Sequence, residues 1–362
     1  MQILSALDAI SPAFSRTKLI LFSPFRKGRT WKLAATAYLT MVSTIFVPYF
    51  LVGLFFIGSA KQGGGSPAVT FLVSFCLGAT LVYLLIFYLC SRLRFAFFDI
   101  VLNGGAFVAP AWRKYSAQSL KWTAFKVVLG TLATAAVAAP MAAWIRHMIP
   151  VFAALQFKPG QTMQPQIMEA VFSFYGAMFL LEIGFGIFYL ISSLLGDFIV
   201  PSLALENTTL AEAFTRLGKL IRHEPGQFTL YAVLKVGLAF VGWIAQTIAF
   251  YAVILVVGLV FGLIAMLVGF ALHALGVSAF VLSALGMTVA IPLYLVLVFY
   301  GMFMAIGTVV TFLESYPLYF LGGRYPMLGD LLDRSTPPPP AIPYPPPPPG
   351  YYTPYVTPPS QP

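Results

Sequence analysis

Residues Phe228–Leu272 read FTLYAVLKVGLAFVGWIAQTIAFYAVILVVGLVFGLIAMLVGFAL, 45 residues with a single charged side chain, Lys235. About 20 apolar residues in a helix cross a bilayer core that is about 30 Å thick, so this run predicts a membrane-spanning element. One straight helix of this length would extend about 67 Å. We therefore expect either a tilted, broken helix with a re-entrant or interfacial end, or two complete spans. Gly258, Gly262 and Gly269 are the places where the helix could bend or pack closely.

The rest of the 362-residue chain is also apolar, since 59% of its residues are hydrophobic and only 9% are charged. A soluble domain carries about 25% charged residues, so the composition excludes a soluble enzyme or a nucleic-acid-binding protein. We expect an all-α, polytopic transmembrane helix bundle. Five further runs are long enough to span: Leu33–Gly58, Ala68–Cys90, Trp122–Trp144, Ile167–Gly196 and Ala279–Leu313.

The distribution of basic residues favours six spans over seven. With six, sixteen Lys and Arg residues of the connecting segments fall on one side, and three (Lys61, Arg146 and Lys158) fall on the other. Basic residues accumulate on the cytoplasmic side, so both termini are predicted to be cytoplasmic. Seven spans would place Arg324 and Arg334 outside.

Four regions follow from this reading. Residues 1–32 form a cytoplasmic amphipathic segment, 33–313 the helix bundle, and 314–336 a cytoplasmic juxtamembrane segment. In the tail, 337–362, 14 of 26 residues are proline, which predicts an extended, disordered segment. Proline-rich segments bind aromatic grooves of partner domains, so a cytoplasmic protein partner is one expectation for the tail.

The segment that precedes the 228–272 run predicts an interfacial helix. Thr209-Leu-Ala-Glu212 is a capping box, and apolar residues then recur at helical spacing. We expect this helix to lie in the headgroup plane with its apolar face in the bilayer. Its basic residues, Arg216, Lys219 and Arg222, would face anionic lipid. Short segments near Phe14 and Trp112 also pair an aromatic residue with an arginine. This suggests a three-fold repeat, in which each unit is an interfacial helix followed by a two-helix hairpin.

Ionisable side chains inside spans are costly and are candidates for function. Glu182 lies near the centre of the fourth span, where it would either bind a proton or cation or form a hydrogen bond across a helix interface. Lys235 would extend to the interface or pair with Asp197 at the inner end of that span. Lys126 is shallower and is expected to extend to the interface. Glu314, at the end of the last span, is expected to contact water.

Arg92, Arg94 and Asp99 form a mixed-charge patch at the inner end of the second span. The patch would either dock the following interfacial helix through ion pairs or contact lipid phosphate. No metal-binding or catalytic motif occurs, and the three histidines are scattered, so we predict no enzyme activity, no metal and no cofactor.

Several segments carry a resemblance: Leu21-Phe-Ser-Pro-Phe25, Arg94-Phe-Ala-Phe-Phe-Asp99, Asp197-Phe-Ile-Val-Pro201 and Glu224-Pro-Gly-Gln-Phe. Together they resemble an uncharacterised bacterial family of six-helix integral-membrane proteins. That family is similar in layout to the membrane domains attached to some glycerophosphodiester phosphodiesterases. The resemblance implies a bacterial inner-membrane setting and supplies no catalytic residue.

Three functional hypotheses stand, of which an intramembrane enzyme is the least favoured because no nucleophile, base or metal constellation occurs. The first is a non-catalytic membrane accessory or scaffold protein that binds anionic lipid headgroups or a protein partner. The alternative is a small transporter or channel that uses Glu182. Nucleic acid is not an expected partner, and the sequence does not predict the oligomeric state.

Overall fold

The chain is described by a computed structural model over residues 2–23, 25, 27–44, 46–47, 67–104, 108–154 and 165–335. These residues form helices and connecting turns, with no strand among them. The helices are α1 (Ile10–Phe22), α2 (Lys27–Val42), α4 (Pro67–Asn103), α5 (Val108–Lys114), α6 (Ser116–Ala154), α7 (Pro165–Glu206), α8 (Leu210–His223), α9 (Pro225–Ala274), α10 (Ala279–Leu285), the π-helical turn η1 (Gly286–Ala290), α11 (Ile291–Gly322) and α12 (Pro326–Ser335).

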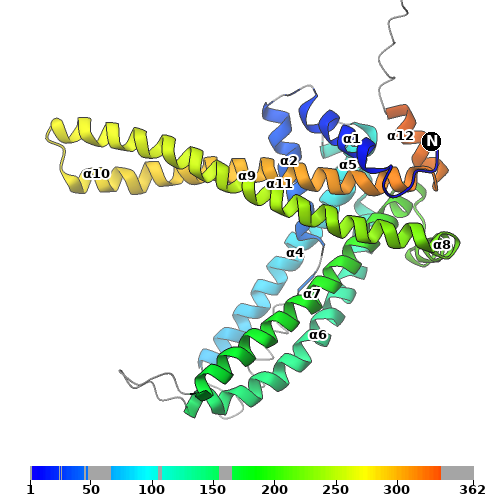
Figure 1. The fold of residues 1–362 in the computed structure, drawn as a ribbon, viewed down its shortest axis with the longest axis horizontal. Helices are drawn as coiled ribbons and strands as arrows, with labels where there is room; N and C mark the ends of the chain where they lie inside the picture. Colours follow the sequence, from blue (N-terminus) through cyan, green and yellow to red (C-terminus); the bar gives the residue numbers. More distant parts are fainter. Residues whose placement is uncertain are drawn as a thin grey trace, which may run out of the picture.

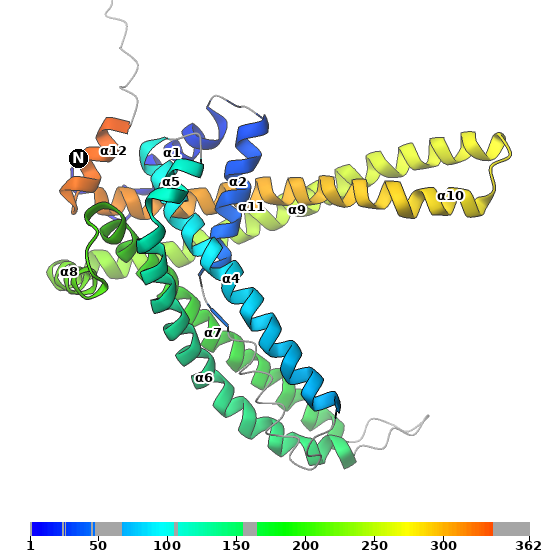
Figure 2. The same ribbon diagram turned by 180° about the vertical axis from the view of Figure 1, so that it is seen from behind.

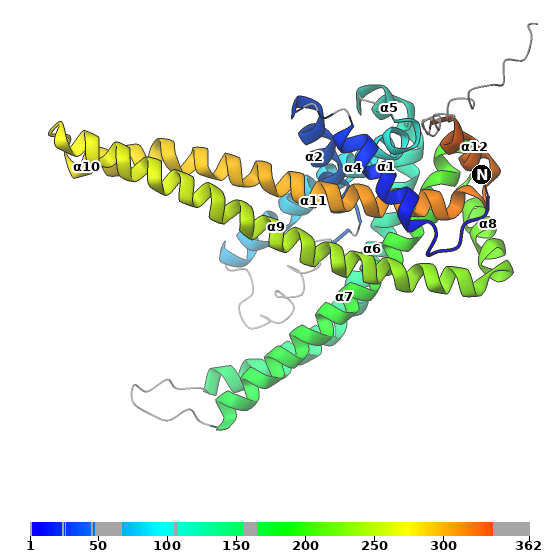
Figure 3. The same ribbon diagram turned by 45° about the horizontal axis from the view of Figure 1, so that its top comes forward.

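The long helices form two arms that diverge from a common region (Figures 1 and 2). One arm contains α4, α6 and α7, and the other is the hairpin of α9 with α10, η1 and α11. We call the common region the hub. It consists of the short helices α1, α2, α5, α8 and α12 together with the adjoining ends of the long helices. Figure 3 shows that α9 and α11 lie side by side along the second arm and that α1 lies over α11.

Five helices in the described part of the chain are long and apolar enough to cross a membrane. They are Val73–Asn103, Ser116–Val137, Val171–Glu206, Pro225–Ala274 and Ala279–Gly322. They correspond to five of the six expected spans. The remaining one, Leu33–Gly58, extends into residues 48–66, outside the described part, and its described residues are helical only to Val42. The six-span count and the three-fold repeat therefore stay predictions.

The 228–272 run is one unbroken helix, α9, of 50 residues and about 75 Å. Both expected alternatives, a broken helix and two complete spans, are therefore wrong, and the helix passes without a break through Gly258, Gly262 and Gly269. A glycine costs a helix only about 1 kcal/mol. Breaking the backbone hydrogen-bond ladder in an apolar medium costs several kcal/mol for each unsatisfied group. The helix therefore continues through all three positions.

Two other glycines bring the helices of this arm together. A Cβ at Gly242 would lie 2.5 Å from Val309 Cγ1, and one at Gly301 would lie 2.5 Å from Val253 Cγ1. Each glycine thus makes room for a valine of the opposite helix. By contrast, a Cβ at Gly262 or Gly269 would meet nothing within 4 Å. The two glycines therefore permit close approach of α9 and α11 near the hub, at Gly242, and near the middle of the arm, at Gly301.

Buried side chains concentrate in the hub, whereas the arms expose apolar surface. The fully buried aromatic residues Trp122, Tyr231 and Phe320 lie in the hub core. On the second arm, Phe240 is 60% exposed and Phe270 is 79% exposed. Apolar surface this extensive does not stay in contact with water in a soluble protein. The arms are thus built to contact lipid, which agrees with the expected multi-pass membrane class.

Buried arginines hold the hub together at helix ends. Arg16 of α1 donates to the carbonyl oxygens of Val101 and Leu102 at 2.9 and 2.8 Å, and to the Ser335 carbonyl oxygen at 2.9 Å. These carbonyls lie at the C-terminal ends of α4 and α12, where a cation is favoured by the helix dipole. Arg324 similarly joins Glu224, at 2.7 Å, to the carbonyl oxygen of Leu4 at 2.8 Å.

Helix α8 confirms the capping box but corrects the expected placement of its apolar face. The Glu212 backbone N–H donates to Thr209 Oγ1 at 3.3 Å, and the Thr209 N–H donates to the Glu212 carboxylate at 2.9 Å. Its apolar residues Ala213 and Leu217 are buried in the hub core, rather than exposed toward a bilayer. Phe214 packs on Phe125 of α6, with ring centroids 5.3 Å apart. The apolar face of α8 therefore packs on the hub core rather than on lipid.

Candidate functional site

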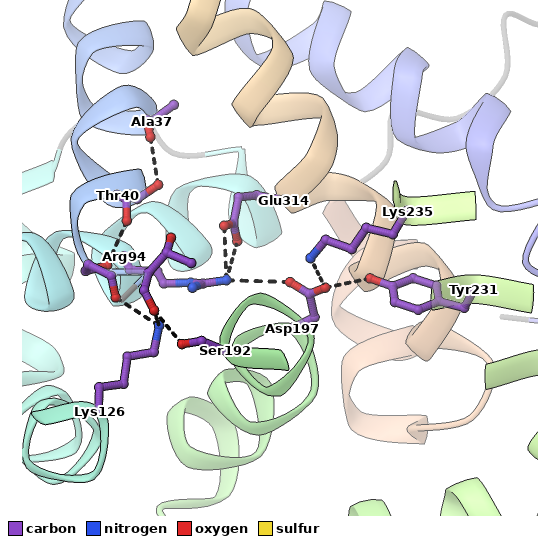
Figure 4. A network of polar contacts seen from close by, with 11 residues as sticks. Ala37, Thr40, Arg94, Lys126, Ser192, Asp197, Tyr231, Lys235 and Glu314 are labelled. Carbon is purple, nitrogen blue, oxygen red and sulfur yellow. Dashed lines mark hydrogen bonds and ion pairs between the residues drawn. The ribbon is translucent and has the colours of Figure 1, made fainter. Parts of the chain in front are cut away.

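One polar network contains a charged residue from each of the five long helices (Figure 4). We call it the junction network, because it lies where both arms join the hub. Its charged members are Arg94 (α4), Lys126 (α6), Asp197 (α7), Lys235 (α9) and Glu314 (α11). Arg94, Lys126, Asp197 and Lys235 are at most 6% exposed.

Asp197 is the centre of the ionic part of the network. Its carboxylate forms an ion pair with Lys235 and accepts a hydrogen bond from the Tyr231 hydroxyl at 2.8 Å. Arg94 Nη2 lies 3.5 Å from Asp197 Oδ1 and 3.1 Å from Glu314 Oε1. Two cations and two anions thus alternate across four helices. Removing one partner from such a buried set leaves an uncompensated charge, which costs about 3–5 kcal/mol.

A glycine of α7 makes room for Arg94. A Cβ at Gly196 would lie 2.7 Å from Cζ, Nη1 and Nη2 of Arg94. The guanidinium therefore lies against the backbone of α7, one residue before Asp197. This close approach sets the position from which Arg94 contacts both carboxylates.

Lys126 forms the other part of the network. Its amino group donates to the carbonyl oxygens of Ser43 and Thr44, both at 2.9 Å, and the Ser192 hydroxyl also donates to Thr44 O. These carbonyls follow the last residue of α2, where helical carbonyls lack partners of their own. Lys126 also lies 5.1 Å from the ring centroid of Trp122. The prediction that Lys126 extends to the interface is wrong, because the carbonyl oxygens of Ser43 and Thr44, just after α2, hold it in the interior.

The structure separates the predicted patch of Arg92, Arg94 and Asp99. Arg92 Nε donates to the Trp112 carbonyl oxygen of α5 at 2.8 Å, and Asp99 accepts from Lys114 and Tyr115 at 3.1 and 2.7 Å. These two residues therefore dock the following short helix, as one alternative expected. Burial raises the pKa of Tyr115 to about 12, so its hydroxyl stays a donor to Asp99. Arg94 points into the junction network instead and is too buried to contact lipid phosphate.

Glu182 lies apart from the network on the first arm. Its side chain is exposed, and no hydrogen bond or ion pair joins it to a described residue. The neighbouring Gly184 faces Val137 of α6, since a Cβ at position 184 would lie 3.4 Å from Val137 Cγ2, whereas the Glu182 side chain is exposed. Neither the expected cross-helix hydrogen bond nor an ion-binding set is present around it in the described residues.

The basic residues of α8 lie on the outer surface of the hub. Arg216, Lys219 and Arg222 are all exposed. Arg216 forms an ion pair with Glu206, whereas Lys219 and Arg222 have no hydrogen bond or ion pair with a described residue. Their charges are therefore available to an external anion.

Sequence reasoning gave the Lys235–Asp197 pair as an alternative but missed Glu314, Lys126 and Tyr231 as its neighbours. One signal was present: Trp122-x-x-x-Lys126 and Tyr231-x-x-x-Lys235 repeat an aromatic residue followed by lysine one helical turn later. No group of three or more His, Cys, Asp or Glu residues that could hold a metal occurs among the described residues. The ion pairs of the junction network hold the long helices in position relative to one another. Its described residues do not place a nucleophile beside a general base.

A protein-family model matches residues 4–331, which is nearly the whole chain. The model describes a family of unknown function, DUF7544. The chain belongs to this family. Comparisons with curated proteins and with solved structures give no match. Membership in DUF7544 carries no assigned activity, so function has to be argued from the geometry of the hub.

Proposed function

We propose that the chain is a non-catalytic membrane accessory protein whose hub binds the anionic surface of the bilayer. The observation that supports this most directly is the arrangement of α8, whose apolar face is fixed on the hub core while Arg216, Lys219 and Arg222 are exposed. A docked helix presents its charges without losing conformational freedom on each binding event. Each Lys or Arg near an anionic bilayer surface contributes about 1 kcal/mol of attraction.

The rest of the hub surface has the same sign. Among the hub residues whose side chains the structure describes, nine basic and four acidic ones are exposed. The basic ones are Lys18, Lys32, Arg113, Lys114, Lys121, Arg216, Lys219, Arg222 and Arg334, and the acidic ones are Asp8, Glu212, Asp330 and Asp333. This excess of positive charge favours the binding of anionic headgroups over the binding of a neutral partner.

A cytoplasmic location of the hub, in a bacterial inner membrane, is part of this proposal. Its support is the sixteen-to-three distribution of Lys and Arg in the sequence. After Cys76 and Cys90 are replaced by Ser, a single cysteine at position 219 should react with an impermeant maleimide only in permeabilised cells. Reaction in intact cells would place the hub outside and contradict the proposal.

The lipid-binding part is tested by purifying the full chain from its membrane with a mild detergent and measuring the lipids that remain bound. We expect the bound fraction to be enriched in anionic phospholipids relative to the membrane. A triple variant, Arg216→Gln, Lys219→Gln and Arg222→Gln, should lose this enrichment. The variant Arg216→Lys with Arg222→Lys keeps the charge and should retain it. An unenriched lipid profile in the wild-type protein would refute the proposal.

The transporter alternative receives no comparable support from the geometry. Glu182, on which it depends, is exposed on α7 and has no hydrogen bond or ion pair with a described residue of the junction network. Recruitment of a protein partner by the proline-rich tail concerns residues 337–362, which lie outside the described part of the chain.

A further inference from the structure

A cavity of about 260 Å³ lies in the hub between α7, α8 and the end of α11. Its apolar lining includes Phe198 of α7, Leu217 of α8 and Leu321 of α11. Three basic side chains, Arg216, Lys219 and Arg324, also line it. An apolar interior with a few charged groups is the usual composition of a site for a small amphiphilic ligand.

The three basic side chains differ in how many hydrogen bonds and ion pairs they already make within the protein. Arg324 donates to Glu224 and to the carbonyl oxygens of Leu4 and Phe320, so its guanidinium is committed to the hub. Arg216 uses Nη1 for Glu206 and keeps its side chain 48% exposed. Lys219 makes no hydrogen bond or ion pair with a described residue.

The charges around the cavity sum in favour of an anion. Glu206 and Glu224 form ion pairs with Arg216 and Arg324, so Lys219 is the cation of the lining that has no counter-ion among the described residues. The remaining donors are the ammonium group of Lys219 and the free N–H groups of Arg216. Both lie on α8, one turn apart, so they can contact one anion together.

We infer that this cavity binds the phosphate group of one anionic membrane lipid, with the adjoining glycerol and first acyl carbons against Phe198, Leu217 and Leu321. This inference rests on the proposed function and names one site for it. Lysine and arginine are the residues that bind phosphate best. A soluble phosphate would use the same two donors, but it would leave the apolar lining uncovered. The cavity is large enough for a headgroup and too small for a complete lipid, whose chains would stay in the bilayer.

Substitutions can separate this cavity from the general surface charge. Ser202→Leu fills the cavity from α7 without changing any charge, since Ser202 lines it. Lys219→Gln removes the free cation. Arg222→Gln is the comparison variant: it removes a surface charge of the same helix, but Arg222 does not line the cavity.

The test is native mass spectrometry of the full chain in detergent, titrated separately with phosphatidylglycerol, phosphatidylcholine, glycerol 3-phosphate and inorganic phosphate. We expect one phosphatidylglycerol molecule to bind the wild-type protein at least tenfold more tightly than phosphatidylcholine or either soluble phosphate. Ser202→Leu should weaken phosphatidylglycerol binding at least tenfold and Lys219→Gln about fivefold. Arg222→Gln removes a surface charge outside the cavity and should weaken phosphatidylglycerol binding measurably less than Lys219→Gln does. If Ser202→Leu does not fold, the contrast between Lys219→Gln and Arg222→Gln decides.

Equal losses in Lys219→Gln and Arg222→Gln would overturn the cavity site but leave the proposed function in place. Binding of a soluble phosphate as tight as that of phosphatidylglycerol would overturn the lipid assignment. If phosphatidylglycerol and phosphatidylcholine bind equally, and the triple Gln variant of α8 changes neither, then both the site and the proposed function fail.

Discussion

Arg94 lies against the backbone of Gly196, so closely that a Cβ at position 196 would be 2.7 Å from the guanidinium carbon. This contact joins α4 to α7 and directs Arg94 toward Asp197 and Glu314. The glycine thus serves packing between two helices rather than a turn. Because Arg94 belongs to the first arm and Glu314 to the second, their ion pair joins the two arms at this position.

Gly196→Ala should destabilise the protein by about 1–3 kcal/mol, because the added methyl group forces Arg94 away from its carboxylates. Thermal unfolding in detergent measures the effect. Gly186→Ala on the same helix is the control, since a Cβ there meets nothing within 4 Å, and it should be neutral or slightly stabilising. Equal effects at both positions would contradict the packing role of Gly196.

Asp197→Ala should cost about 3–5 kcal/mol, because it leaves Lys235 and part of Arg94 buried without a counter-charge. The double variant Asp197→Ala with Lys235→Met should cost less than the sum of the single variants, since they remove a shared interaction. Chemical denaturation of all four proteins in the cycle gives the coupling energy. Additive losses would show that the pair does not form.

Glu182→Gln should change stability by less than about 1 kcal/mol, because the side chain is exposed and has no hydrogen bond or ion pair with a described residue. Growth and proton or cation flux should also stay at the wild-type level. Loss of flux in a stably folded Glu182→Gln protein would revive the transporter hypothesis and count against the accessory role.

Acid should loosen the start of α8. The hydrogen bonds from the backbone and side chain of Thr209 lower the pKa of Glu212 below its ordinary value of 4.5. The capping box therefore contributes its full stability above that ordinary value and loses it as pH falls through the lower folded pKa. Hydrogen exchange of the first turn of α8, corrected for intrinsic rates, should rise only below about pH 4.5. Glu212→Gln should remove this acid-dependent step.

Local sequence patterns predicted the elements of this fold better than their association. Thr209 and Glu212 lie three residues apart, so the capping box could be recognised without any tertiary information. Five apolar runs likewise sufficed to predict the long helices. The network was less accessible, because Arg94 and Glu314 are 220 positions apart and meet only through packing.

The location of single charges depended on which neighbours compete for them. Lys126 lies near the start of the expected span Trp122–Trp144, where a lysine side chain usually extends to the interface. The carbonyl oxygens of Ser43 and Thr44 hold it inside the protein instead. The apolar face of α8 has the pattern of an interfacial helix, but the hub core covers it. In both cases the sequence pattern predicts which side chains are polar or apolar, but it does not predict whether they contact lipid or another part of the protein.

The most direct test of the account compares α8 in proteoliposomes of phosphatidylglycerol and of phosphatidylcholine. Protease protection of residues 208–222 should be higher in phosphatidylglycerol. The triple Gln variant at Arg216, Lys219 and Arg222 should lose this difference, at about 1 kcal/mol for each charge removed, while the spans stay inserted. Protection that is the same in both lipids, or that the triple variant leaves unchanged, would contradict a role for the hub in binding the anionic bilayer surface.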